Sequence, residues 1–352
     1  MKLRTVVLAA VAALVVAAPA SARSVPRGWL GVTVDGPLTA AGNPFGSEYD
    51  LMKASGVETV RAAFSWRDAQ PQAGAPISFA ATDAVVTAAA ARRLPVLPVV
   101  QDTPSWAGRG SAASAPDDVA AYARYVGALV ERYGPRGSLW AERPDLPRLP
   151  VRDWQIWNEP NLTLFWTPQP FARRYVKLLK AARAAVLARD RGARIVLAGL
   201  PNISWVALRQ IYRAGGRGAF DAVALHPYTS TPRNIIRLVR LARTETRHFH
   251  DGHVPIWLTE ISWAASRGKV KGLPGLVTTD HGQAVRLRKA VRQLARVRKA
   301  YRIQHVFWYT WLSRPGPDNP FDWSGLRRLR GDRVSSAPAL AAFRRAARAL
   351  ER

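Results

Sequence analysis

The sequence predicts an α/β fold, a single-domain (β/α)8 TIM barrel, and three observations predict it. Short apolar runs alternate eight times with long amphipathic stretches, as expected for parallel strands covered by helices. Residues 23–352 have the size of one such barrel, and no Ser/Thr/Pro-rich linker divides them. The first run lacks the Gly-rich phosphate turn that an open, doubly wound sheet would carry there.

The eight strands and eight helices follow one another along the chain. We predict strands over 29–36, 58–66, 94–101, 153–158, 194–200, 221–226, 255–260 and 305–311. We predict helices over 48–54, 81–92, 116–133, 170–190, 204–214, 232–249, 280–301 and 338–350. Regular strand–helix alternation implies right-handed parallel crossovers, and eight such units close into a barrel.

The N-terminus resembles a cleaved secretory signal. Met1-Lys2-Leu3-Arg4 precedes an apolar run over 6–18, and Ala20-Ser21-Ala22 follows it. This is a charged segment, a short apolar segment and an Ala-x-Ala cleavage site, and the apolar run is too short to span a bilayer. We therefore predict a signal peptide over 1–22, a catalytic domain over 23–352, and a secreted protein with no membrane span. The chain contains no cysteine, so the core has to stabilise it without disulfides.

The chain is strongly basic, with a formal net charge of +28. Arginine enrichment from a GC-rich genome accounts for this composition, and association with an anionic cell-wall polymer is the alternative interpretation. We find no nucleic-acid-binding motif and expect no nucleic acid partner. We also find no cofactor-binding motif and expect no cofactor.

Two glutamates end apolar strands on opposite sides of the predicted barrel. Glu159 follows the fourth strand in Trp157-Asn158-Glu159-Pro160, and Glu260 ends the seventh in Leu258-Thr259-Glu260. In a barrel of this kind reactive groups lie at the carboxyl ends of strands, so the two side chains can converge over the barrel axis. A pair of carboxyl groups is the minimum equipment for cleaving a glycosidic bond.

These motifs resemble clan A of the glycoside hydrolases. Within the clan the sequence is most similar to family 39, the β-xylosidase and α-iduronidase-like group, and next to family 5. The resemblance implies a retaining hydrolase of a poly- or oligosaccharide, with Glu159 as general acid/base and Glu260 as nucleophile. A secreted carbohydrate-binding barrel without catalysis, holding anionic cell-wall glycan, is the alternative.

The resemblance also implies roles for the neighbouring polar residues. Asn158 matches the asparagine that binds the sugar 2-hydroxyl, and Arg61 matches the strand-two arginine that keeps the nucleophile ionised. His226 and Tyr228 match the His-x-Tyr of strand six, where the tyrosine contacts the nucleophile and the histidine lies near the acid/base. The third strand departs from the pattern: it ends in Gln101-Asp102, where many clan members carry a histidine.

Aromatic residues are the remaining candidates for the sugar site. Strand eight of the clan supplies a tryptophan to the floor of the −1 site, and Trp311 is our first choice and Trp308 our second. Trp66, Trp106 and Trp166 lie in loops on the same rim, where they could stack on sugar rings. His248, His250 and His253 form the one cluster that suggests zinc, but we expect a solvated helix-to-strand turn there and no metal.

Overall fold

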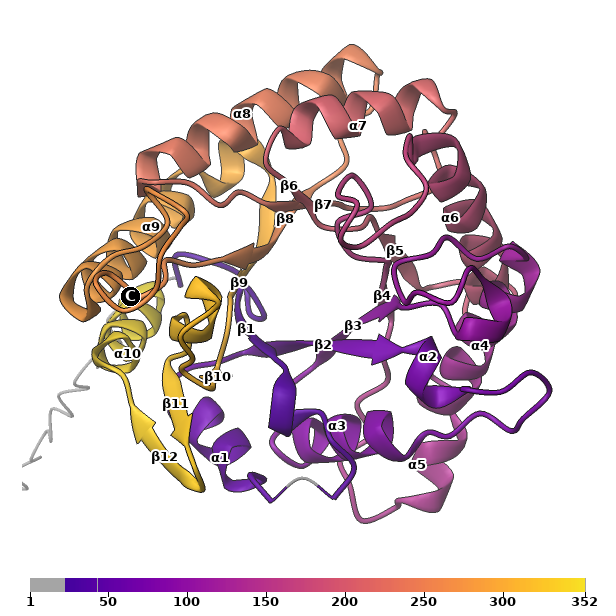
Figure 1. The fold of residues 1–352 in the computed structure, drawn as a ribbon, viewed down its shortest axis with the longest axis horizontal. Helices are drawn as coiled ribbons and strands as arrows, with labels where there is room; N and C mark the ends of the chain where they lie inside the picture. The colour runs from indigo at the N-terminus through magenta and orange to yellow at the C-terminus, as the bar shows by residue number, and fades with distance from the viewer. Residues whose placement is uncertain (1–22, 43, 352) are drawn as a thin grey trace, which may run out of the picture.

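In the computed structural model, which describes residues 23–42 and 44–351, a parallel sheet curls into a barrel (Figure 1). The leader predicted over 1–22 lies outside the described residues. The strand order is β5-β4-β3-β2-β1-β9-β8-β7-β6. The strands are β1 Leu30–Val34, β2 Thr59–Ser65, β3 Val96–Gln101, β4 Asp153–Ile156, β5 Arg194–Val196, β6 Leu200–Pro201, β7 Val223–His226, β8 Ile256–Ile261 and β9 Ile303–Trp308.

Strands β5 and β6 are two pieces of one barrel strand. β5 pairs with β4 and β6 pairs with β7, while only residues 197–199 separate the two pieces. Within this gap the Leu197 amide donates to the Ala222 carbonyl oxygen at 2.9 Å. The sheet therefore closes with eight strand positions, and the predicted α/β barrel is confirmed with the fifth strand broken in the middle.

The helices surround the barrel (Figure 1). All eight predicted helices are present, as α1 Ser47–Ala54, α3 Ala80–Ala91, α4 Val119–Tyr133, α6 Ala172–Leu187, α7 Ser204–Arg213, α8 Pro232–His248, α9 Asp280–Tyr301 and α10 Pro338–Leu350. The short helices α2 Trp66–Ala69 and α5 Ser138–Glu142 were not predicted. None of the helices in the described ranges has the length and apolar character needed to cross a bilayer.

Side chains fill the barrel interior below the ends of the strands. A small buried cluster inside the sheet comprises Leu97, Val196, Ala222, Ala224, Trp257 and Phe307. β1 contributes Gly31 here, where an added Cβ would lie 2.7 Å from the Phe307 ring. The floor of the barrel is thus packed with apolar groups, and open space is left at the carboxyl ends of the strands.

A three-stranded sheet follows β9 and was not predicted. It consists of β10 Leu312–Ser313, β11 Arg327–Arg330 and β12 Arg333–Ser336, and the 3-10 helix η3 Pro320–Trp323 precedes β11. The hairpin buries little besides Leu329, and its sequence from 327 to 336 is mostly polar. This segment therefore lacks the apolar run on which strand prediction depends. The predicted strand over 305–311 correspondingly ends early, at Trp308.

Candidate active site

A cavity of about 620 Å³ opens at the carboxyl ends of the barrel strands. Arg61 of β2, Glu159 after β4, Tyr228 after β7 and Glu260 of β8 all line it, and so does Asn158. His226, at the end of β7, lies fully buried directly beneath. The structure therefore brings together all six of the polar residues singled out from the sequence.

Glu260 is held by hydrogen bonds to both carboxylate oxygens. Arg61 Nη1 donates to Oε1 at 2.6 Å, and the Tyr228 hydroxyl donates to Oε2 at 2.6 Å. Burial by itself raises the pKa of Glu260, but the charges of His226 and Arg61 and these hydrogen bonds outweigh it, so the pKa lies below its ordinary value. Glu260 is therefore the ionised carboxylate of the site.

Arg61 is buried, and each part of its guanidinium has a partner. Nε donates to Gln155 Oε1 at 2.8 Å, and Nη2 donates to Asn158 Oδ1 at 2.9 Å. Gln155 in turn donates from Nε2 to the Leu197 carbonyl at 3.1 Å. Sequence reasoning missed Gln155, although an amide in the middle of a buried apolar strand signals a polar partner inside the barrel.

Glu159 leaves the strand in an uncommon backbone conformation. Its φ is +43°, and Trp157 two residues earlier has φ +71°; positive φ is rare for residues other than glycine. The Glu159 amide donates to the Gly199 carbonyl at 3.1 Å, which ties this turn to the broken fifth strand. The turn places the Glu159 carboxyl group over the barrel mouth.

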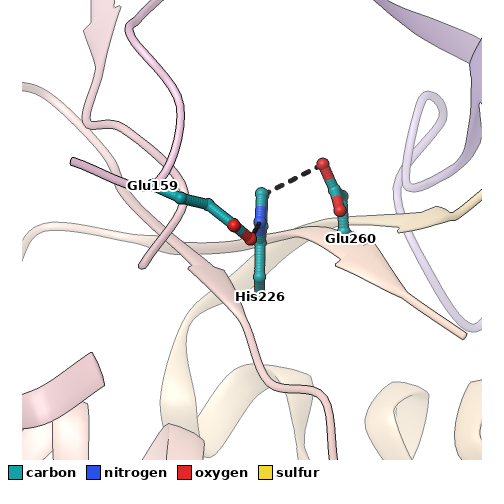
Figure 2. A group of neighbouring side chains, drawn as sticks. All are labelled: Glu159, His226 and Glu260. Carbon is teal, nitrogen blue, oxygen red and sulfur yellow. Dashed lines mark hydrogen bonds and ion pairs between the residues drawn. The ribbon is translucent and has the colours of Figure 1, made fainter. Parts of the chain in front are cut away.

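His226 joins the two glutamates. Its Nδ1 lies 2.6 Å from Glu159 Oε1, and its Nε2 lies 3.6 Å from Glu260 Oε1. Figure 2 shows the imidazole between the two carboxyl groups. One oxygen of Glu159 and one of Glu260 lie within 4.8 Å of each other.

Gly199 makes room for this imidazole. A Cβ built on Gly199 would lie 2.0 Å from His226 Nε2 and 2.4 Å from its Cε1, far inside van der Waals contact. Any larger residue at position 199 would therefore displace the ring. The sequence carried no signal for this role, because Gly199 and His226 lie on different strands.

A third carboxylate, that of Asp35, lines the same cavity. Thr310 Oγ1 donates to Asp35 Oδ1 at 3.0 Å, and the Tyr309 hydroxyl also hydrogen-bonds to this carboxyl group. Burial raises the pKa of Asp35 to about 6, against the lowering effect of these two hydrogen bonds. Asp35 directly follows the first strand and was missed, although an acid at such a position is the same signal that identified Glu260.

The structure corrects the aromatic residues expected at the floor of the site. Trp311 is buried and donates to Glu48 Oε2 at 2.8 Å, and Trp308 donates to the Ser324 carbonyl at 3.0 Å. Neither lines the cavity; Tyr309 does. β9 ends at Trp308, so strand alternation does not extend to Trp311.

Two of the tryptophans expected in the loops, Trp66 and Trp166, are fully buried, and Trp106 is half-buried and packs against the core. The rings of Trp66 and Trp106 meet edge to face at 5.3 Å, and Trp166 packs edge-on against Trp157 at 5.0 Å. Trp66, Trp106 and Trp166 are all absent from the cavity lining. Gln101 does line it, so the third strand reaches the site despite lacking the clan's histidine.

Among the described residues, one group of side chains lies close enough together to bind a metal ion: Glu159, His226 and Glu260. The Arg61 cation lies 2.6 Å from Glu260 Oε1, where its charge would repel a metal ion bound by that oxygen. This arrangement is better suited to proton transfer and nucleophilic attack. His248, His250 and His253 are exposed and form no such group.

Comparison with solved structures finds this fold in glycoside hydrolases. A family 39 glycoside hydrolase from the gut symbiont Bacteroides cellulosilyticus WH2 superposes with a TM-score of 0.69 at 19% identity, over 91% of this chain and 63% of that protein. A monomeric β-xylosidase from Caulobacter crescentus CB15 gives 0.67 at 19% identity, over 92% and 68%. A GH5_18 protein from Bifidobacterium longum, in complex with Manβ1-4GlcNAc, gives 0.67 at 16% identity, over 91% and 78%.

Families 39 and 5, the two families that the motifs were expected to resemble, are both represented among these structures of the same fold. The chain spans about 63% of the length of the Bacteroides protein. No protein-family model matches the sequence, and no curated protein does. At these identities the comparisons establish the fold, and the site geometry has to carry the function.

Proposed function

We propose that this protein is a secreted retaining glycoside hydrolase in which Glu260 is the nucleophile and Glu159 the general acid/base. The observation that carries the proposal is the carboxyl pair: one oxygen of each lies within 4.8 Å of the other. Retaining enzymes place their carboxyl groups about 5 Å apart, whereas inverting enzymes leave about 6.5–9.5 Å for a water molecule. The N-terminal signal pattern supports secretion.

In the first step the Glu260 carboxylate attacks the anomeric carbon of the bound sugar. The bond from that carbon to the leaving oxygen breaks, and protonated Glu159 gives its proton to this oxygen. Arg61 and Tyr228 hold the Glu260 carboxylate in one orientation. Since Arg61 also donates to Asn158 Oδ1, the amide nitrogen of Asn158 is oriented as a donor for a sugar hydroxyl.

In the second step water hydrolyses the glycosyl ester on Glu260. Glu159, now a carboxylate, takes a proton from the water as its oxygen attacks the anomeric carbon, and the ester bond to Glu260 breaks. The hydrogen bond from His226 to Glu159 fixes the position of this group. Two displacements on the same carbon restore its original configuration.

The test is to trap the intermediate. We expect a 2-deoxy-2-fluoro glycoside with an activated leaving group, screened over common pyranosides, to add one glycosyl group to the protein. Peptide mapping by mass spectrometry should place it on Glu260, and Glu260→Gln should abolish it. A noncatalytic carbohydrate-binding barrel would bind these sugars and remain unlabelled, so labelling separates the two functions.

Replacing Gly199 by alanine should disable the site without touching either glutamate. We expect Gly199→Ala to lower kcat/KM by about 100-fold, since displacements of the order of 1 Å have effects of this size and the added Cβ displaces the His226 ring. The measurement is hydrolysis of an aryl glycoside, with a thermal melt to establish folding. Gly46→Ala is the matched control, because an added Cβ there meets nothing within 4 Å.

A double-mutant cycle distinguishes this positioning role from general destabilisation. In a His226→Ala background, the change Gly199→Ala should cost little further activity, since no ring remains to be displaced. An equal loss in both backgrounds would show that Gly199 acts through something other than His226.

A further inference from the structure

The mouth of the cavity is aliphatic, in contrast to its floor. Three large hydrophobic residues are exposed in the described part of the chain: Leu164 at 73%, Ile203 at 56% and Leu273 at 41%. Leu164 and Leu273 line the cavity, and Ile203 directly follows its lining residue Asn202. Exposed leucines scattered singly need no explanation, but a group of them at the rim of one cleft indicates a binding surface.

Two loops contribute most of the apolar side chains at this mouth. Leu162, Leu164 and Phe165 belong to the loop after β4, and Leu273 and Leu276 belong to the loop between β8 and α9. Both loops are held by backbone hydrogen bonds. The Leu162 amide donates to the Glu159 carbonyl at 2.9 Å, and the Ala264 amide donates to the Leu276 carbonyl at 3.1 Å.

One loop of the rim follows β4 and begins at Glu159, and the other follows β8, the strand that carries Glu260. The turn that carries Leu162 begins at Glu159, the residue proposed to protonate the leaving oxygen. Asp35, directly after β1, and Arg61, within β2, also line the cavity, and Arg61 donates to Glu260. The cavity thus has charged groups around Glu260 and exposed leucines at its mouth, one of them on the loop that begins at the proposed acid/base.

This division does not suit a polysaccharide on the leaving-group side. Sugar rings present a hydroxylated edge and a flat face, and such subsites pair hydrogen-bonding groups with flat aromatic rings. None of Trp66, Trp106 and Trp166 lines the cavity, and the phenylalanines Phe165 and Phe321 are among the aromatic residues that do. The branched aliphatic side chains at the mouth instead favour an apolar group. Each methylene of that group that is buried there makes binding more favourable.

We infer that the substrate is a glycoside with an aliphatic aglycone, such as a long alkyl or lipid chain, seated between Leu164 and Leu273. This inference rests on the proposed glycosidase function. It narrows the substrate from the poly- or oligosaccharide expected from the sequence to an amphiphilic glycoside.

The experiment compares methyl, butyl and octyl glycosides of the sugar that traps the intermediate, below their micellar concentrations. A fully buried methylene contributes about fourfold, so partial burial of an octyl chain should raise kcat/KM by at least about 100-fold over methyl. The rim variant Leu164→Ser/Leu273→Ser should flatten this dependence, so that its ratio of kcat/KM between the octyl and the methyl glycoside falls toward one. Leu146→Ser is the control, because Leu146 lies on the loop that leads into β4 at the other end of the barrel. This variant should retain the dependence of kcat/KM on chain length.

Each other outcome has a definite meaning. If chain length has no effect, or if an oligosaccharide of the same sugar is hydrolysed faster than the octyl glycoside, the inference is wrong while the glycosidase function stands. If no glycoside is hydrolysed or trapped, the proposed function itself has failed. If the rim variant loses sedimentation with phosphatidylcholine vesicles but keeps the chain-length dependence, the leucines contact a membrane surface and the aglycone assignment is overturned.

Discussion

Glu260→Gly is expected to reduce turnover by a factor on the order of 10⁴ or more, because it removes the carboxylate that we propose forms the glycosyl ester. Added azide should then restore turnover. The removed side chain leaves space beside the anomeric carbon, and azide attacking from that side yields a glycosyl azide of inverted configuration. The measurement is kcat with and without azide on an aryl glycoside, and NMR of the product.

Two further variants separate chemistry from folding in this experiment. Glu260→Gly leaves the buried Arg61 cation without its carboxylate partner, which destabilises a protein by about 3–5 kcal/mol. Glu260→Gln, which keeps the shape of the side chain, should also be inactive, and azide should not rescue it. Glu142→Gln removes a surface carboxylate that pairs with Arg132 and should keep full activity. Near-native turnover by Glu260→Gln would refute the assignment of the nucleophile.

Glu159→Ala is expected to have an effect that depends on the leaving group. An alkyl glycoside needs its leaving oxygen protonated, so we expect a loss of about 10³–10⁴-fold, the upper range for general acid catalysis. A 2,4-dinitrophenyl glycoside has a leaving group that departs as an anion, and its glycosylation step should change by less than about tenfold. The measurement is kcat/KM for a series of aryl and alkyl glycosides in both proteins.

Azide distinguishes the two glutamates by stereochemistry. In Glu159→Ala the glycosyl ester on Glu260 still forms, and azide attacking it should yield a glycosyl azide of retained configuration. This is opposite to the product expected from Glu260→Gly. Equal losses on alkyl and dinitrophenyl substrates, or an inverted product, would show that Glu159 is not the acid/base.

Much of the site could be located from the sequence because strand ends of a parallel barrel meet on one rim. Glu159, Glu260 and His226 each lie at or near the end of an apolar run, and Arg61 lies within one; the structure places all four around one cavity. The same reasoning failed for Trp311. β9 ends at Trp308, and a two-residue periodicity no longer applies once the strand has ended.

The high positive charge is an example of a property that composition alone could not interpret. Many arginines form ion pairs, such as Arg132 with Asp83 and Arg194 with Asp153. Others, such as Arg288 and Arg292 on α9, are exposed and have no ion-pair partner among the described residues. Only the distribution of these charges over the folded surface distinguishes the two groups.

The sequence by itself determined the eight-fold strand–helix alternation and the pair of glutamates at the ends of two of its strands. Local periodicity and strand length determine these features, and both can be read from neighbouring residues. Only the tertiary structure decided that Gly199 makes room for His226, that Gln155 and Asn158 complete the partners of Arg61, and that leucines from two loops form the rim. These contacts join residues far apart in the chain, and the closure of the barrel brings them together.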